Sequence, residues 1–106
     1  MTAEPRQIFL APDRPQPRAP RGFSHINRYW DKHQGVYAAK ILPGEFYVST
    51  AGEMIVTVLG SCIAACIWDV KSRTGGMNHF MLPDGDSLDG SGRYGSYAME
   101  LLINEM

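Results

Sequence analysis

The residues most able to do chemistry in this chain lie in the stretch TVLGSCIAAC, residues 57–66. Its two cysteines, Cys62 and Cys66, are the only ones in the sequence. Gly60 and the β-branched residues favour a strand over a helix here. A strand rises ~3.3 Å per residue, which places the two Cα atoms ~13 Å apart. Because a disulfide needs a Cα separation below ~7 Å, both cysteines are expected to be free thiols.

Cys62 is the candidate nucleophile of this stretch. Gly60 permits a positive φ and a close backbone approach, so the N–H groups around Gly60, Ser61 and Cys62 are expected to stabilise an oxyanion. Cys66 lies among alanine and isoleucine in an apolar run, and we interpret it as a small core residue. The competing interpretation of Cys62 is likewise a buried, unreactive cysteine.

A thiol nucleophile needs a base, because a free thiol is mostly protonated at neutral pH. His79 lies in MNHFML, the apolar run after the one that contains Cys66. If the two runs pair about a turn centred on Ser72, Cys62 and His79 lie three residues apart along the ladder, ~10 Å. A bulge, or a turn centred nearer residues 70–71, brings them together. The alternative is a purely structural histidine.

Other kinds of site fit the sequence less well. Cys62, Cys66 and His79 supply three zinc ligands, whereas structural zinc sites use four. DGDSLDG, residues 84–90, has the opening spacing of a calcium loop, but Gly95 occupies the place of the closing glutamate. RYW suggests stacking on RNA bases without the signature of an RNA-binding fold. No metal ion, cofactor or nucleic acid is therefore expected.

The elements that position these residues are predicted to be mostly strands. Runs rich in β-branched and aromatic residues predict strands at residues 36–42, 45–49, 54–59, 63–69 and 77–82. Pro43-Gly44 marks a turn between the first two strands. One helix is predicted at residues 96–106, with Ser96 capping its first turn. Residues 22–35 are interpreted as a bridging segment whose aromatic residues cover the edge of a core.

Length and charge bound the class of protein. The 106 residues allow one small domain, and ten Lys and Arg nearly cancel eleven Asp and Glu, which argues against general attraction to nucleic acid or anionic membranes. No apolar run approaches the ~20 residues of a membrane helix. With no recognisable signal peptide, a cytoplasmic location is expected. Residues 1–22 hold five of the seven prolines and four arginines, which predicts a disordered tail before a domain at 23–106.

Three stretches together carry a family resemblance: TVLGSCIAACIWD, GGMNHFMLP and RYGSYAMELLINEM closely resemble the chemoreceptor glutamine deamidases, the CheD family. Residues 22–50 are similar to the N-terminal part of its proteobacterial members. The resemblance implies that Cys62 is the nucleophile and His79 the catalytic histidine. The family's third residue is a threonine, commonly six positions before the cysteine. Val56 occupies that position here, so Thr57 is the only candidate for the role.

The resemblance also implies an activity and a fold. It implies hydrolysis of receptor glutamine amides to glutamate, and of glutamyl methyl esters, by cysteine–histidine catalysis without cofactor or metal. The implied fold is α/β of the α+β type, with packed mixed sheets flanked by helices. The implied partners are the cytoplasmic helical region of methyl-accepting chemotaxis receptors and a CheC-type phosphatase.

Members of the family continue beyond their first helix. The chain is therefore expected to be cut short after its helix, with residues 23–106 forming the N-terminal part of a CheD-like domain. The alternative function is a catalytically inactive CheD-like module that binds receptors or a chemotaxis partner.

Overall fold

The computed structural model of the chain describes residues 8–81 and 91–106, with side chains in the second range from Gly95 onward. It contains six strands and one helix: β1 (Asn27–Asp31), β2 (Val36–Lys40), β3 (Phe46–Ser49), β4 (Met54–Val56), β5 (Cys62–Asp69), β6 (Thr74–Met81) and α1 (Ser91–Glu105). The mixed α/β class predicted from the sequence is thereby confirmed. No helix in these ranges is long and apolar enough to cross a membrane.

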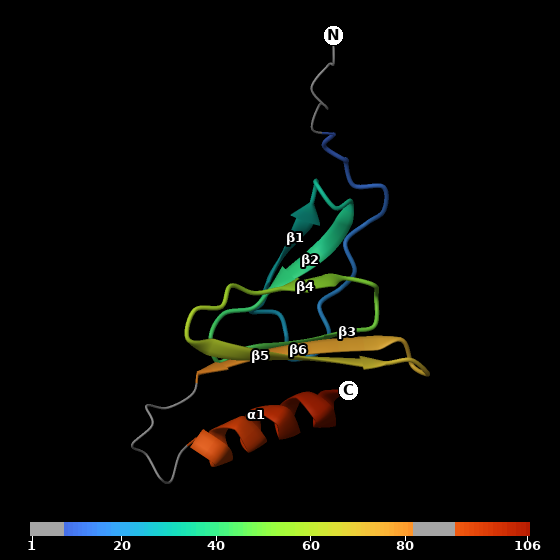
Figure 1. Cartoon of the computed structure of the whole chain (residues 1–106). Helices are drawn as coiled ribbons and strands as arrows, with labels where there is room; N and C mark the ends of the chain where they lie inside the picture. Colours follow the sequence, from blue (N-terminus) through green and yellow to red (C-terminus); the bar gives the residue numbers. More distant parts are fainter. Residues whose placement is uncertain (1–7, 82–90) are drawn as a thin grey trace.

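The strands form two three-stranded sheets. Sheet A has the order β1-β2-β4, with β1 antiparallel and β4 parallel to β2. Sheet B has the order β3-β6-β5 and is antiparallel throughout. Helix α1 packs on the face of sheet B that points away from sheet A (Figure 1). Gly76 in β6 allows this close approach, because a Cβ there would lie 2.8 Å from Leu102 Cδ1.

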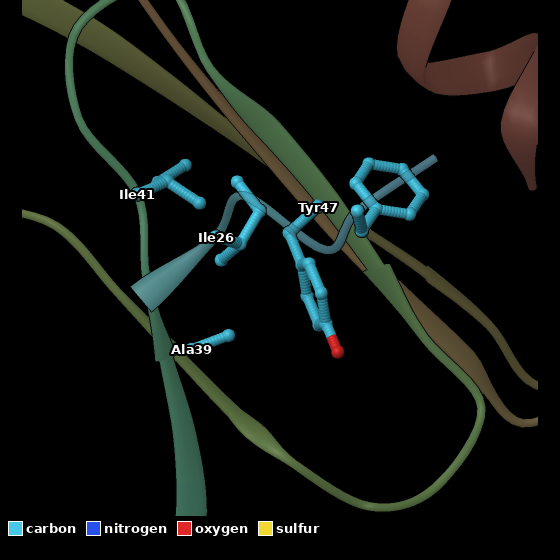
Figure 2. Packing of buried hydrophobic residues seen from close by; sticks show 5 residues of the cluster. Ile26, Ala39, Ile41 and Tyr47 are labelled. Carbon is cyan, nitrogen blue, oxygen red and sulfur yellow. The ribbon is translucent and has the colours of Figure 1, made fainter. Parts of the chain in front are cut away.

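The hydrophobic core lies between the two sheets. Its buried members are Phe23, Ile26, Ala39, Ile41 and Tyr47. Figure 2 shows the last four converging from β1, β2 and β3 and their flanks. Aromatic rings fill most of this space, with the Phe23 ring centroid 5.3 Å from that of Tyr47 in an edge-to-face arrangement. The core therefore holds the end of β2 near the start of β3, and the candidate site lies there.

The buried carboxylate of Glu53 is the centre of a hydrogen-bond network that joins its own loop to β3, to β1 and, through Arg28, to Pro17. Its Oε1 accepts hydrogen bonds from the hydroxyls of Tyr47 at 2.6 Å and Ser49 at 3.2 Å. Its Oε2 accepts from Arg28 Nε at 3.0 Å, and Arg28 also donates to the carbonyl of Pro17. Burial, followed by the hydrogen bond to Glu53, raises the pKa of Tyr47 well above its usual value, so its hydroxyl remains a donor.

Glu53→Gln is expected to lower the free energy of unfolding by about 3–5 kcal/mol, because the Arg28 guanidinium loses its partner in a site where it is only 10% exposed. The measurement is urea denaturation. Glu100→Gln is the matched control, since Glu100 is exposed on α1 and the same change there should cost under ~0.5 kcal/mol. Equal unfolding free energies for the two variants would show that Glu53 does not stabilise the fold.

The β5–β6 hairpin sets the register around the two cysteines. Its turn is residues 70–73, and Asp69 pairs with Thr74. Asp69 holds the turn by accepting from the Ser72 hydroxyl at 2.8 Å and the Lys71 N–H at 3.0 Å, and these bonds lower the pKa of its carboxyl. The sequence predicts a turn centred on Ser72. In the structure Asp69 pairs with Thr74, so the turn is centred between residues 71 and 72, half a residue earlier.

The structure also corrects the predicted element bounds. The segment interpreted as a bridge contains strand β1, whose Trp30 ring packs edge-to-face on Tyr37 of β2 with centroids 4.8 Å apart. Helix α1 begins at Ser91, so Ser96 is an interior residue and not its cap. Gly95 disfavours a helix by intrinsic propensity, yet it packs there against Phe80. The residues 84–90 considered for calcium lie outside the described residues.

The segment predicted to be a disordered tail carries no helix or strand in residues 8–22, yet it contacts sheet A. The Leu10 carbonyl accepts from Trp30 Nε1 at 2.7 Å, and the Arg14 carbonyl accepts from the Tyr37 hydroxyl at 2.5 Å. These bonds attach the segment to the β1–β2 hairpin. The division of the chain at residue 22 stays a prediction.

Candidate active site

His79 lies near the end of β6 and is 2% exposed. The turn between β2 and β3 holds its backbone on one side. Gly44 N–H donates to the His79 carbonyl at 2.7 Å, and His79 N–H donates to the Glu45 carbonyl at 3.0 Å. Gly44 has φ of +85° and follows Pro43, as a type II turn requires, and Glu45 N–H closes the turn on Leu42 at 2.9 Å. The sequence predicts the Pro43-Gly44 turn, but it gives no sign of the two backbone hydrogen bonds between this turn and His79.

Thr57 orients the imidazole ring of His79. Its Oγ1 lies 2.7 Å from His79 Nδ1 and 2.8 Å from the carbonyl oxygen of Ile41. A carbonyl only accepts, so the single hydroxyl proton of Thr57 goes to Ile41 and its oxygen accepts from Nδ1–H. The neutral ring is thereby held in the tautomer with the proton on Nδ1. Its other nitrogen, Nε2, then carries a lone pair.

The Nε2 atom of His79 is buried and has no hydrogen-bond partner among the described residues. Burying a polar atom without a partner costs free energy, so such atoms are rare in folded proteins. A structural histidine in a core would be expected to use both nitrogens. An oriented ring with a free Nε2 is the arrangement that a general base needs.

Cys62 is the first residue of β5 and pairs with Met81 of β6, while Ala64 pairs with His79. Cys62 and His79 therefore lie two positions apart along the ladder, on the same face of sheet B. The sequence-based register placed them three positions apart, on opposite faces, and is wrong by one residue. The turn spans residues 70–73, so its centre lies half a residue before Ser72, and the resulting pairing puts Cys62 and His79 on one face. The Nε2 atom of His79 makes no hydrogen bond to Cys62.

Thr57 escapes strand alternation because β4 ends at Val56. The expected strand over residues 54–59 would have sent Thr57 and Val56 to opposite faces. With the strand ended, residues 57–61 form an irregular connection to β5. This connection, the start of β5 and the end of β6 lie at the same end of the molecule (Figure 1). Thr57 therefore contacts His79 although it lies one residue later than the threonine of the family pattern.

The connection before Cys62 supplies unpaired backbone donors. Within the described part of the chain, the N–H groups of residues 58–61 make no hydrogen bond. Gly60 does not adopt the positive φ that the sequence analysis allowed for, and a Cβ on it would meet nothing within 4 Å. Because Gly60 has no side chain, a ligand can approach its backbone closely. The glycine is not needed here for a strained turn.

Exposed apolar side chains surround this end of sheet B. Val58 and Leu59 precede Cys62, Met81 lies opposite it, and Leu42 follows the residue whose carbonyl binds Thr57. Their exposed fractions run from 49% to 75%. We call these four residues the apolar rim: Leu42, Val58, Leu59 and Met81. Clustered exposed apolar residues mark sites of protein association.

Cys66 is exposed, which contradicts its interpretation as a core residue. It lies on the same face of β5 as Cys62, but β5 is the edge strand of sheet B. An apolar run predicts burial only where another layer covers it. Neither cysteine is in a disulfide, as expected. Among the residues with described positions, no group of three or more His, Cys, Asp or Glu side chains is placed to hold a metal ion.

Iodoacetamide is therefore expected to alkylate Cys66 in the folded chain, in addition to the half-buried Cys62. Mass mapping of the labelled peptides measures both, and the Cys66→Ser variant isolates the reaction at Cys62. Complete protection of Cys66 under conditions that label Cys62 would contradict the exposed position of β5.

Comparison with known sequences finds curated proteins that are similar to most of this chain. A protein of Albidiferax ferrireducens named probable chemoreceptor glutamine deamidase CheD 1 is 69% identical over 78 residues, which are 74% of this chain and 33% of the relative. Proteins named probable chemoreceptor glutamine deamidase CheD from Halorhodospira halophila and Hahella chejuensis are 57% and 51% identical, covering 80% and 87% of this chain but 44% and 46% of the relatives. The chain thus spans less than half the length of these curated relatives. No protein-family model and no solved structure matches it.

Proposed function

Because this chain corresponds to the N-terminal part of a CheD-family protein, we propose that it carries the catalytic residues of a chemoreceptor glutamine deamidase. The substrate is the side-chain amide of a receptor glutamine, and the product is glutamate. The observation that carries the proposal is the oriented His79 ring, with Thr57 on Nδ1 at 2.7 Å and a free Nε2 on the sheet face that also bears Cys62.

The reaction begins with proton transfer from the Cys62 thiol to His79 Nε2. The thiolate then attacks the amide carbon of the glutamine, and the negative charge moves to the carbonyl oxygen. Free N–H groups in residues 58–61 are the donors available to stabilise that oxyanion. His79 returns its proton to the amide nitrogen, the C–N bond breaks, and ammonia leaves a thioester on Cys62.

Hydrolysis of the thioester completes the cycle. His79 Nε2 takes a proton from water, and the hydroxide attacks the thioester carbon. The C–S bond breaks, the sulfur regains a proton from His79, and the glutamate carboxyl is released. Thr57 keeps the ring in one orientation through both halves. The same route hydrolyses a glutamyl methyl ester, with methanol in place of ammonia as the leaving group.

The apolar rim favours a protein substrate over free glutamine. Free glutamine is small and zwitterionic, and it gains little from the exposed apolar side chains of the rim. An amphipathic helix buries its apolar face against such a surface while one glutamine side chain reaches Cys62. This supports the cytoplasmic helical region of methyl-accepting chemotaxis receptors as the substrate, and hence a cytoplasmic location. A CheC-type phosphatase is proposed as a second partner on family grounds alone.

The direct test is a mass-spectrometric assay of the chain with a helical receptor fragment. Conversion of glutamine to glutamate raises the fragment mass slightly and releases ammonia. The second candidate function is binding without catalysis, for which the exposed apolar rim is sufficient. A fusion that continues this chain with the following residues of a relative separates the two. If the fragment binds to the fusion and no glutamate forms, binding alone is the function.

A further inference from the structure

A cavity lies beside the candidate active site. It has a volume of about 140 Å³ and is lined by His25, Asn27, Lys40, Leu42 and Glu45. We call it the Lys40 pocket. Lys40, Leu42 and Glu45 of its lining belong to the segment between the end of β2 and the start of β3. In Figure 1 this segment lies at the same end of the molecule as the start of β5. A volume of this size holds several water molecules, and therefore the end of one polar side chain.

The strand register places the Lys40 pocket next to His79. Phe46 pairs with Asn78, so the preceding residue of the chain, Glu45, lies beside His79, whose N–H it binds at 3.0 Å. Sheet B has the order β3-β6-β5, so the pocket lies on the side of His79 opposite to Cys62.

The charged group of the pocket that has no partner among the described residues is the Lys40 ammonium. The Glu45 carboxylate is already engaged: Oε1 accepts from Leu42 N–H at 2.7 Å, and Oε2 lies 3.7 Å from His25 Nε2. Lys40 and Asn27 side chains have no hydrogen bond or ion pair with any described residue. Lys40 carries three donors and no acceptor, so the group that satisfies it is an acceptor, and its charge favours a carboxylate.

We propose that the Lys40 pocket binds a carboxylate side chain of the same protein substrate whose glutamine reaches Cys62. This rests on the proposed function and adds a recognition rule to it. Glu45, at the edge of the pocket, and Cys62 are separated by two strand spacings and two residues along the ladder, which together give ~12 Å between their Cα atoms. An α-helix rises ~1.5 Å per residue, so the carboxylate lies about two turns, seven or eight residues, from the glutamine. Lys40 is a specificity residue and takes no part in the chemistry.

The test uses two helical peptides that differ at one position. Both carry the glutamine, and seven residues away one carries glutamate and the other alanine. Affinity is measured by calorimetry with a Cys62→Ala chain, so that no turnover intervenes. The glutamate peptide should bind about 10-fold more tightly, in line with one charge-assisted hydrogen bond. Lys40→Gln should remove this preference while leaving the affinity for the alanine peptide unchanged.

The control is Lys71→Gln, which removes one charge from the exposed β5–β6 turn and should keep the preference. Lys40→Glu with a lysine in place of the glutamate should restore tight binding. Equal affinities for the two peptides, no binding of either, or an unaltered preference in Lys40→Gln each overturn the proposal. Turnover is assayed separately with Cys62 intact. A carboxylate preference without formation of glutamate would leave the pocket assigned and contradict the deamidase function alone.

Discussion

Replacing Cys62 by serine is expected to abolish deamidation of receptor glutamines. The hydroxyl of serine is far less acidic than a thiol, and His79 is not strong enough a base to make it a comparable nucleophile. Loss of a nucleophile removes both steps of a covalent mechanism, so the rate should fall by at least ~10³-fold. His79→Ala should fall nearly as far, because the same ring nitrogen serves both halves of the reaction. The measurement is the change in mass of the receptor fragment over time.

Cys66→Ser is the matched control for Cys62→Ser. The two cysteines lie in the same strand and on the same face, but Cys66 pairs with Met77, four residues further from the site. We expect activity close to that of the unchanged chain. The assay is run on the 106-residue chain and on its fusion to the following residues of a relative. A Cys62→Ser fusion that produces glutamate at the normal rate would exclude Cys62 as the nucleophile.

Thr57→Val is expected to lower the rate by about 100-fold, as when a catalytic base loses the group that orients it. Valine has nearly the same shape as threonine, so the packing against β2 remains. Valine has no oxygen to accept a hydrogen bond from His79 Nδ1–H. The tautomer with its proton on Nδ1 is then no longer favoured over the one with its proton on Nε2. The fall should appear in kcat rather than in KM, because Thr57 contacts the histidine and not the substrate.

Thr57→Ser separates orientation from packing. Serine keeps the hydroxyl that donates to the Ile41 carbonyl and accepts from the ring, so most of the activity should return. A loss of stability would instead affect both variants and would appear as a lower urea midpoint. If Thr57→Val and the unchanged chain have the same kcat, the hydrogen bond at 2.7 Å does not serve catalysis.

Much of the fold was predictable because it depends on local patterns. Five of the six strands and the helix were predicted, and the Pro43-Gly44 turn was placed correctly, since proline and glycine at those positions favour one turn type. Strand β1 was missed because its alternation is hidden by polar residues. The Arg28 side chain of β1 donates to Glu53, a buried acid 25 residues further along the chain. A buried ion pair between distant residues leaves no periodic signal in a sequence.

The sequence by itself determined which residues are available for chemistry: two thiols that do not form a disulfide, one histidine in an apolar strand, and a threonine near the cysteine. It also determined the family, through short stretches that carry specific spacing. Only the structure fixed the register that brings Cys62 and His79 to one face: the β5–β6 turn, in which Asp69 accepts from the Ser72 hydroxyl, pairs Ala64 with His79. Tertiary structure alone decided that Thr57 reaches His79, because β4 ends at Val56, three residues before the end of the predicted strand, and Thr57 is then free of strand alternation. Cys66 is exposed for the same kind of reason: burial depends on which layer covers a strand, and that depends on how the whole chain packs.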